Sequence, residues 1–238
     1  MGHILVTGGS RGIGKAVVES LITEKKSIIY TYANENPNES FLKQKAKENG
    51  VDCFSFKVDQ KNNFQVEKFC NQLISEYSDI EAIILNAGIS QNSLVANITD
   101  KQWNEVIETN LYGPFYYLRN MYNYFISKGE GTVITVSSMA AINGSIGAAA
   151  YAASKGGIIG LAKSVGKEMA RFGIKSYIIA PGYVETDMTA NLNMKKTVSK
   201  ILMGRLGTPQ EIADLIAYLI TKKNFFQNNI FTADGGNV

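Results

Sequence analysis

Three residues in the second half of the chain have the types and spacing needed for proton transfer. Tyr151 and Lys155 are four residues apart, and Ser138 precedes the tyrosine in the segment Val133-Ile-Thr-Val-Ser-Ser138. Residues four apart share one face of a helix, so a phenol and an ammonium can meet one substrate. A fixed positive charge lowers the pKa of a phenol, which ordinarily lies near ~10, and this favours general acid catalysis. Tyr-x-x-x-Lys is also typical of ordinary amphipathic helices, so its meaning depends on the rest of the chain.

The composition limits what the protein can be. The chain has 238 residues, 45% of them apolar, and a formal net charge of +3 from dispersed basic residues. We therefore expect one domain, residues 1–238, with a large core, and the charge does not indicate nucleic-acid binding. His3 is the only histidine, and Cys53 and Cys70 are far apart. We expect no metal site and no disulfide framework, but reduced thiols as in the cytosol.

The N-terminus and the hydropathy pattern predict a cytoplasmic protein. Met1-Gly2-His3 leads directly into apolar residues, with no charged n-region and no small-residue cleavage site. Val6 stands where myristoylation prefers Ser or Thr. No apolar run approaches the ~20 residues that a membrane span requires, so we expect no membrane association.

A strand, a glycine-rich loop and a helix open the chain. The apolar residues 4–7 are followed by Gly8-Gly9-Ser10-Arg11-Gly12-Ile13-Gly14, after which apolar residues recur at helical spacing. Glycines permit a tight turn and let phosphate oxygens approach a helix N-terminus, where free N–H groups favour an anion. We predict that this loop binds the pyrophosphate of a dinucleotide rather than serving only as a turn.

The residues after the second predicted strand bear on the choice of dinucleotide. A free ribose 2′-hydroxyl is usually held by Asp or Glu at this position, whereas a 2′-phosphate requires positive charge and neutral donors. The strand at 27–32 ends in Ala33 and Asn34, and Arg11 in the glycine loop can reach the same place. This favours NADP(H) over NAD(H). Glu35 is the counter-evidence, and the alternative for Arg11 is a solvated loop charge.

Apolar runs and helical patterns alternate along the remaining chain. We expect further strands at 53–58, 82–85, 131–137, 174–180 and 230–232, and helices at 39–48, 64–74, 99–110, 115–125, 151–171 and 211–220. This alternation implies right-handed crossovers and a doubly wound, seven-stranded parallel sheet with helices on both faces. Such sheets bind ligands beyond the carboxyl ends of their strands, which is where we expect the glycine loop, Asn34, Asp59, Asn86 and Ser138.

The roles of several residues at that edge can be interpreted in more than one way. Asp59 could accept a hydrogen bond from adenine, or it could cap the next helix. The small residues of Asn86-Ala87-Gly88 permit a cofactor ring to lie against the backbone. Asn110 is locally unfavourable in mid-helix, which suggests a side-chain or backbone role, although a solvated asparagine is the alternative. The loop from Pro181 to Met188 leaves the sixth strand at this edge, and residues 184–206 are predicted to form a mobile lid over a substrate.

Taken together, these motifs resemble the short-chain dehydrogenase/reductase family over essentially the whole chain. The matching residues occur in the family's order: Thr7-Gly8-x-x-x-Gly12-x-Gly14, Asn86-Ala87-Gly88, Asn110, Ser138, Tyr151-x-x-x-Lys155 and Pro181-Gly182. The resemblance implies a single Rossmann-type fold. Within the family, Glu185-Thr-Asp-Met188, Gly204-Arg-Leu-Gly207 and Asp234-Gly-Gly236 are similar to 3-oxoacyl-[acyl-carrier-protein] reductases, while acetoacetyl-CoA reductases and polyketide-type ketoreductases share much of the pattern.

The resemblance also implies a role for each matched residue. Tyr151 would protonate the carbonyl oxygen as hydride arrives, Ser138 would hydrogen-bond the same oxygen, and Lys155 would hold the nicotinamide ribose and lower the tyrosine pKa. Asn110 would support a water chain that resupplies protons. The pyrophosphate would lie on Gly12 to Gly14, adenine on Asp59, the adjoining ribose on Asn86, and the nicotinamide carboxamide on Val184 and Thr186. The predicted cofactor site comprises Gly8, Ser10, Arg11, Gly12, Ile13, Gly14, Asn34, Asp59, Asn86, Ala87, Gly88, Tyr151, Lys155, Pro181, Gly182, Val184 and Thr186.

The expected substrate is a 3-oxoacyl thioester, possibly on an acyl carrier protein, reduced with NADPH in fatty-acid or related acyl-chain synthesis. Reduction of another ketone and a non-catalytic dinucleotide sensor are alternatives. Gly129-Glu130 and Phe172 fall where carrier-protein reductases often have basic residues for an acidic carrier. Lys163, Lys167 and Arg171 share a helical face that could replace them, or they form a solvated face. The family and the aromatic segment 115–125 suggest a homotetramer, with that segment serving as core and subunit interface.

Overall fold

The chain folds around one parallel sheet of seven strands, and the structure, a computed structural model, describes residues 2–77 and 79–236. The strands are β1 (His3–Val6), β2 (Ser27–Tyr32), β3 (Cys53–Lys57), β4 (Ile80–Leu85), β5 (Gly131–Val136), β6 (Ile174–Pro181) and β7 (Asn229–Ala233). Their order is β3-β2-β1-β4-β5-β6-β7, and every neighbouring pair is parallel. The predicted fold class is therefore confirmed.

The central strands are apolar along their whole length because both faces of the sheet are covered. In β1, Ile4, Leu5 and Val6 are all fully buried, although successive side chains point to opposite faces. Ile4 belongs to the core cluster on one face and Leu5 to the cluster on the other. An apolar run without alternation thus reports burial on two sides, as the sequence pattern predicted.

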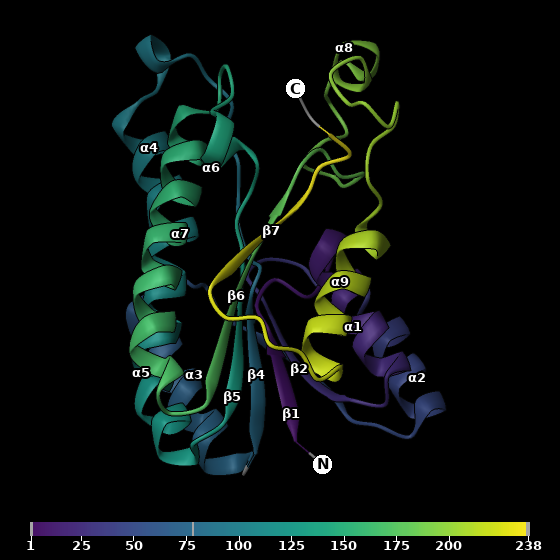
Figure 1. The fold of residues 1–238 in the computed structure, drawn as a ribbon, viewed down its shortest axis with the longest axis vertical. Helices are drawn as coiled ribbons and strands as arrows, with labels where there is room; N and C mark the ends of the chain where they lie inside the picture. The colour runs from purple at the N-terminus through teal and green to yellow at the C-terminus, as the bar shows by residue number, and fades with distance from the viewer. Residues whose placement is uncertain (1, 78, 237–238) are drawn as a thin grey trace.

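Two helical layers enclose the sheet (Figure 1). The first contains α1 (Gly12–Thr23), α2 (Glu39–Asn49) and α9 (Pro209–Thr221), and it packs on the cluster that includes Val17, Leu42 and Ile216. The second contains α3 (Asn63–Glu76), α5 (Gly113–Lys128) and α7 (Ala149–Ala170), and it packs on the cluster that includes Phe69, Tyr117 and Met169. No helix among the described residues has the length and apolar character to cross a membrane.

The structure differs from the predicted helices in four places. The helix predicted at 99–110 ends earlier, since α4 (Asp100–Ile107) is followed by a π-helical turn, η2 (Glu108–Tyr112), that runs directly into α5. Three short helices were not predicted: η1 (Val95–Asn97), α6 (Ala140–Asn143) and α8 (Met194–Val198). Each has five or fewer residues, too few to show a helical apolar period in the sequence.

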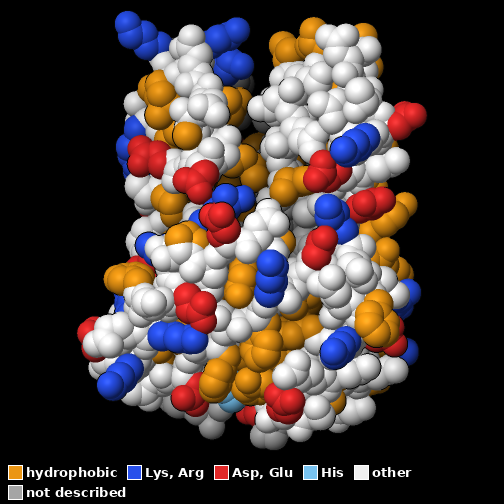
Figure 2. All heavy atoms as spheres, turned by 180° about the vertical axis from the view of Figure 1, so that it is seen from behind, with side chains coloured by type: hydrophobic (Ala, Val, Ile, Leu, Met, Phe, Trp, Pro, Cys, Tyr) orange, Lys and Arg blue, Asp and Glu red, His pale blue; other side chains and the backbone are white. Residues whose placement is uncertain are grey.

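The strand order reverses between β1 and β4, and a crevice opens at the carboxyl ends of these two strands. Two lobes extend beyond that edge of the sheet. One carries α8 and the other carries η1, α4 and α6 (Figure 1). The space-filling view from behind shows a deep notch between the lobes (Figure 2). The fold therefore gathers the loops after β1, β4, β5 and β6 around one opening.

Candidate active site

Thr7 and Asn86 hold the glycine loop against the loop after β4. The Thr7 hydroxyl accepts hydrogen bonds from the backbone N–H groups of Asn86 (3.0 Å) and Ala87 (3.1 Å). In return, the Asn86 side-chain amide donates to the carbonyls of Thr7 (3.0 Å) and Gly8 (3.2 Å). Both sides of the crevice are thus fixed to each other by four hydrogen bonds, two of which use the side-chain amide nitrogen of Asn86, and the predicted ribose contact of Asn86 stays a prediction.

Glycines in this region occupy positions that a side chain would fill. A Cβ atom on Gly14 would lie 2.1 Å from the Gly8 carbonyl oxygen, and one on Gly8, whose φ is +68°, would lie 2.9 Å from Ala87. The helix α1 begins after Arg11 with no side-chain cap and no acidic residue in its first turn. Its first N–H groups and its dipole therefore remain available to an anion, and the glycine cradle fits a pyrophosphate.

Gly88 brings the crevice into contact with the predicted catalytic residues. A Cβ atom at this position would lie 3.1 Å from Asn110 Oδ1 and 3.3 Å from Lys155 Nζ. The backbone after β4 therefore passes directly beside the buried lysine. This contact joins the glycine loop and the catalytic helix α7 into one site.

Arg11 and Asn34, the residues predicted to select the dinucleotide, are both exposed. The Arg11 guanidinium lies 3.9 Å from the Asp187 carboxylate, in a pair whose side chains are 70% and 78% exposed, so it is directed to the lid. Asn34 is exposed after β2. The Asp59 carboxylate accepts a hydrogen bond from the backbone of Lys61, and Asn62 rather than Asp59 caps α3. The capping alternative for Asp59 is therefore wrong, and its adenine contact stays a prediction.

The loop after β6 closes the other side of the opening. Thr186 packs beside Gly12, since a Cβ atom there would lie 3.5 Å from the threonine methyl group. Gly182 packs against Asp234, and Val184 is buried in the core and forms a bridge to Gly207. Pro181 ends β6. The predicted nicotinamide-binding segment thus lies beside the glycine loop, while the Val184 side chain is occupied by packing.

Ser138, Tyr151 and Lys155 meet at the carboxyl end of β5. Lys155 is 3% exposed, and its ammonium donates to the Val136 carbonyl at 2.7 Å. The same nitrogen lies 5.9 Å from the centre of the Tyr151 ring. The Ser138 hydroxyl accepts from the Ala140 N–H at 3.1 Å and lies beside the tyrosine hydroxyl. The predicted face of α7 therefore does bring the phenol and the ammonium together.

The electrostatics of this pair correct one expectation. Burial raises the pKa of Tyr151, and hydrogen bonding with Ser138 opposes this only in part. Burial also lowers the pKa of Lys155 to about 8. The expected pKa below the ordinary value is therefore wrong for this structure, because the penalty of burying the phenolate is larger than the stabilisation from Ser138. At neutral pH the phenol keeps its proton and the amine is mostly charged.

Asn110 is fully buried in the π-helical turn between α4 and α5. Its side-chain oxygen accepts from the Ile89 N–H at 2.8 Å, and its amide donates to the Ile89 carbonyl (2.8 Å) and the Ser154 hydroxyl (3.0 Å). The solvated alternative is therefore wrong, because the side chain is buried and hydrogen-bonded, while the catalytic role of Asn110 stays a prediction. The side chain fixes the segment after Gly88 to α7, so a proton-supplying water chain, which stays a prediction, would have to use backbone groups of Asn110.

Two residues that the sequence did not single out support this arrangement. Gln60 is 6% exposed and donates to the carbonyls of Thr109 (2.6 Å) and Ala87 (3.2 Å), which ties the crevice to the π-helical turn. Ser154 donates to the Tyr151 carbonyl at 2.7 Å and accepts from Asn110. The position of Ser154 within the Tyr-x-x-x-Lys motif could have suggested that it belongs to the site. No sequence pattern indicates such a role for Gln60.

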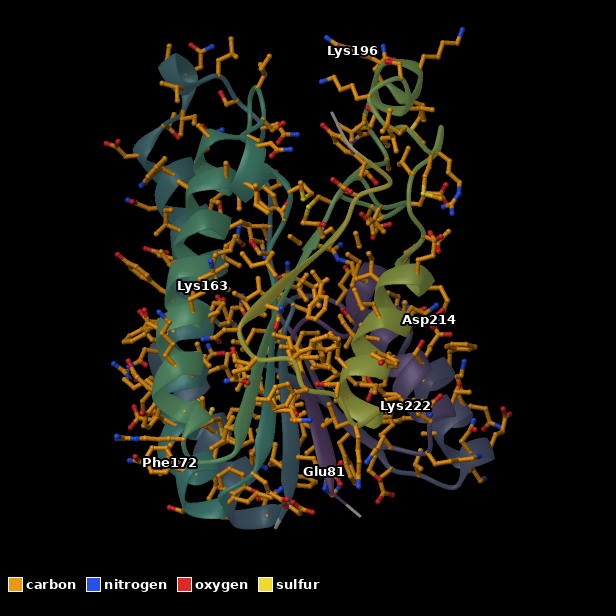
Figure 3. All side chains as sticks on the ribbon, in the orientation of Figure 1. Glu81, Lys163, Phe172, Lys196, Asp214 and Lys222 are labelled. Carbon is orange, nitrogen blue, oxygen red and sulfur yellow. The ribbon has the colours of Figure 1, made fainter. Side chains whose placement is uncertain are left out.

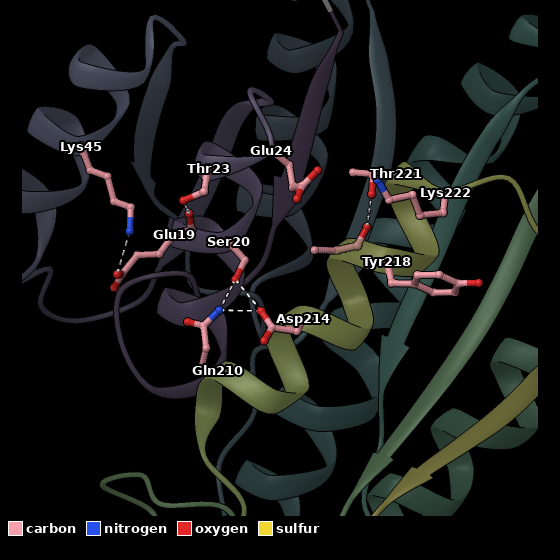
Figure 4. A pocket seen from close by; sticks show the side chains of 11 residues that line it. Glu19, Ser20, Thr23, Glu24, Lys45, Gln210, Asp214, Tyr218, Thr221 and Lys222 are labelled. Carbon is pink, nitrogen blue, oxygen red and sulfur yellow. Dashed lines mark hydrogen bonds and ion pairs between the residues drawn. The ribbon is translucent and has the colours of Figure 1, made fainter.

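A separate groove lies between α1, α2 and α9, away from the carboxyl edge (Figure 4). Its polar groups satisfy one another, since the Gln210 amide donates to the Ser20 hydroxyl and to the Asp214 carboxylate, both at 2.6 Å. Within residues 2–77 and 79–236, no group of three or more His, Cys, Asp or Glu side chains could hold a metal ion. The crevice at the carboxyl edge is therefore the site on which the functional argument rests.

Comparison with known proteins decides the family. The family model described as short chain dehydrogenase matches residues 2–197. The chain belongs to the short-chain dehydrogenase family. It is 34% identical over 218 residues to the 3-oxoacyl-[acyl-carrier-protein] reductase FabG of Escherichia coli, covering 90% of this chain and 88% of that protein. It is 32% identical to the 3-oxoacyl-[acyl-carrier-protein] reductase of Synechocystis sp. over 236 residues, covering 98% and 96% of the two chains.

A third relative is also a 3-oxoacyl-[acyl-carrier-protein] reductase. FabG of Staphylococcus aureus is 31% identical over 222 residues, covering 92% of this chain and 90% of that protein. These similarities run through the crevice, the catalytic helix and most of the lid. The short-chain dehydrogenase is thus an oxidoreductase of a family that uses a nicotinamide cofactor.

Proposed function

We propose that this short-chain dehydrogenase reduces 3-oxoacyl thioesters to 3-hydroxyacyl thioesters with NADPH. The observation that carries the proposal is the convergence of the Ser138, Tyr151 and Lys155 side chains beside a glycine cradle. The relatives named as 3-oxoacyl-[acyl-carrier-protein] reductases support the choice of substrate. We further propose acyl-chain synthesis in the cytoplasm as its setting, with one domain acting in a homotetramer.

The residues of the crevice fit a dinucleotide. The loop from Gly8 to Gly14 would hold the pyrophosphate at the start of α1, and Asn86 would lie at the ribose that adjoins adenine. Ala87 and Gly88 would lie against a cofactor ring, Lys155 would hold the nicotinamide ribose, and Pro181 to Thr186 would hold the nicotinamide end. Asp59 and Asn34 would lie at the adenosine end, with Ser10, Arg11 and Ile13 near the phosphates. When bound, the reduced nicotinamide supplies the hydride to the substrate carbonyl carbon.

Two side chains of this protein then stabilise the negative charge that develops on the carbonyl oxygen. Because the pKa of Tyr151 is raised by burial, the phenol is protonated until negative charge develops on the substrate oxygen, and it then transfers its proton. Ser138 donates a second hydrogen bond to that oxygen. Both donors are fixed before the reaction, so they stabilise the transition state without a cost of reorganisation.

Lys155 acts through its charge and its position. With a pKa of about 8, its amine is mostly protonated at pH 7. Its bond to the Val136 carbonyl leaves two N–H donors for ribose hydroxyls. Its positive charge also stabilises the phenolate that remains after proton transfer, which is the stage at which a nearby cation has the largest effect.

One assay tests the proposal directly. Oxidation of NADPH is followed with acetoacetyl-coenzyme A and with an acetoacetyl carrier protein, and both reactions are repeated with NADH. We expect turnover of the thioesters and a higher kcat/KM with NADPH. Turnover of simple ketones alone would favour the alternative that this enzyme reduces another ketone, and tight NADPH binding without any turnover would favour a dinucleotide sensor.

A further inference from the structure

The lid carries three lysines that the proposed reaction does not use. Between Met188 and Gly204 the chain contains Lys195, Lys196 and Lys200 and no acidic residue. All three of these lid lysines are exposed, and none forms an ion pair with a carboxylate in the described part of the chain. Figure 3 shows Lys196 at the far end of the lid lobe, whereas Lys222 lies towards the opposite end of the molecule. Positive charge is thus concentrated at the mouth of the opening.

The lid lysines are displayed by an ordered element. They lie on and directly after α8, which the Asn193 side chain caps by accepting from the Lys196 N–H at 3.1 Å. Thr197 and Ile201 are buried beneath this helix and anchor it to the lobe. The charged side chains are therefore held on the outer side of a turn that the core fixes in place.

An apolar surface lies in the opposite lobe. We call Leu94, Val95, Ile142 and Ile146 the apolar lip; all four are exposed, and Ile146 is 93% exposed. Its two segments are joined by a bridge between Ser93 and Ala148 and by a hydrogen bond of 2.8 Å from the Ser93 N–H to the Gly147 carbonyl. On the lid lobe, Met188 and Met194 are also about half exposed. The space-filling view from behind shows apolar side chains beside the notch and Lys or Arg side chains at the outer end of one lobe (Figure 2).

This distribution fits a ligand that is apolar at one end and anionic at the other. The acyl group of a thioester must reach Tyr151 inside the notch, so the handle that carries it extends outwards between the two lobes. Coenzyme A and acyl carrier proteins share one such handle, the phosphopantetheine arm, in which a phosphate lies at the far end from the sulfur. Lysine ammonium groups bind phosphate as point charges.

We propose that the lid lysines bind the phosphate of the phosphopantetheine arm while the apolar lip contacts the chain that enters the notch. The inference rests on the proposed function for its choice of ligand. It assigns recognition of the phosphate to the lid, at a place separate from Lys163, Lys167 and Arg171 on α7. Recognition at a solvent-exposed rim mainly affects KM and weakens with salt, because exposed charges are screened.

A binding experiment tests the inference without any turnover. The protein saturated with NADP⁺ is titrated with phosphopantetheine and with pantetheine, which differ by one phosphate. We expect the phosphorylated arm to bind about tenfold more tightly at low salt, and the triple variant Lys195→Gln, Lys196→Gln, Lys200→Gln to lose that preference. The control variant Lys47→Gln, Lys222→Gln, Lys223→Gln removes the same charge from exposed sites elsewhere and should keep it. Equal affinity of the wild-type protein for both compounds would overturn the inference.

Kinetics then separate the two sources of the arm. In the lid variant, KM should rise about tenfold for both acetoacetyl-coenzyme A and the acetoacetyl carrier protein, with kcat unchanged. KM should stay the same for acetoacetyl-N-acetylcysteamine, which lacks the phosphate. An effect confined to the carrier protein would show that the lysines contact the carrier surface, and equal effects on all three substrates would indicate a distorted lid; either result refutes phosphate recognition. If no thioester is reduced by the wild-type protein, the proposed function fails, and the binding comparison still decides this inference.

Discussion

The crevice between β1 and β4 and the lid after β6 border the same opening, yet they are held in different ways. In the crevice, Thr7, Asn86 and Gln60 connect three segments by hydrogen bonds between side chains and backbone, and glycines bring the backbones into contact. The lid is held by a bridge between Val184 and Gly207, by hydrogen bonds from Leu202 and Met203 to the carbonyls of Gly236 and Gly235, and by α8, whose Thr197 is buried.

The difference indicates that the crevice and the lid have different functions in this enzyme. A crevice that is fixed before ligands bind can place a cofactor and a proton donor accurately, which electrostatic stabilisation of a transition state requires. A lid that exposes long side chains can contact the variable part of a substrate without disturbing that geometry. Substitutions in the crevice should therefore affect kcat and stability, whereas substitutions in the lid should affect KM.

The strongest test on the crevice side is removal of the Tyr151 hydroxyl. In Tyr151→Phe we expect kcat for acetoacetyl-coenzyme A to fall by a factor of about 10² to 10⁴, because the general acid is lost. NADPH affinity, measured by fluorescence titration, should be retained. Tyr218→Phe changes an exposed tyrosine on α9 and serves as the control. A Tyr151→Phe enzyme with unchanged turnover would refute the assigned acid.

The buried charge of Lys155 should also be measurable as a pH dependence of stability. Burial lowers its pKa from 10.5 to about 8, so folding penalises the charged form. The penalty is fully present below pH 8 and is relieved as pH rises towards the unfolded value of 10.5. Relative to Lys155→Met, the free energy of unfolding of the wild-type protein should therefore increase by about 2 kcal/mol between pH 8 and pH 10, as measured by urea unfolding. A constant difference between the two proteins would show that the amine is solvated.

Much of the crevice was predictable because its steric requirements restrict which residue types can occupy a position. Gly14 and Gly8 are required by close backbone approaches, and the apolar strands are required by burial on both faces. Asn110 was noticed because asparagine is unfavourable within a helix. Gln60 was not, since its function depends on two carbonyls that only the fold brings together. The direction of the Tyr151 pKa was wrong for a similar reason, because spacing shows a neighbouring charge but not the extent of burial.

The lid was less predictable. Residues 189–206 contain few turn signals, and the sequence therefore suggested a mobile lid without indicating a helix in it. The structure instead contains α8 and buries Thr197 and Ile201 beneath it. One helical turn and two anchoring side chains are too local to produce a periodic pattern. Whether the lid moves over a substrate stays a prediction.

Two glycines on helices offer a matched test of the rigid crevice. In Gly14→Ala the new Cβ would lie 2.1 Å from the Gly8 carbonyl oxygen and 2.5 Å from the Asn86 amide nitrogen. We expect a loss of about 1 to 3 kcal/mol in the free energy of unfolding, together with weaker NADPH binding, because the backbone must move. Gly160→Ala on α7, which meets nothing within 4 Å, should instead gain about 0.5 to 1 kcal/mol. Equal effects in a thermal unfolding assay would contradict the proposed tight contact.

The smallest expected effect lies where the two regions meet, at Arg11 and Asp187. Their side chains are 3.9 Å apart and largely exposed, so the pair should contribute less than about 1 kcal/mol. If Arg11 contacts the 2′-phosphate of NADPH, the lid carboxylate competes for it. Asp187→Asn should then lower KM for NADPH about twofold and leave KM for NADH unchanged, and the difference should disappear at high salt. Glu185→Gln, which neutralises another exposed carboxylate in the same loop, is the control. An equal change for both dinucleotides would mean that Arg11 acts on the shared pyrophosphate, and the selection of NADPH would have to come from the residues after β2.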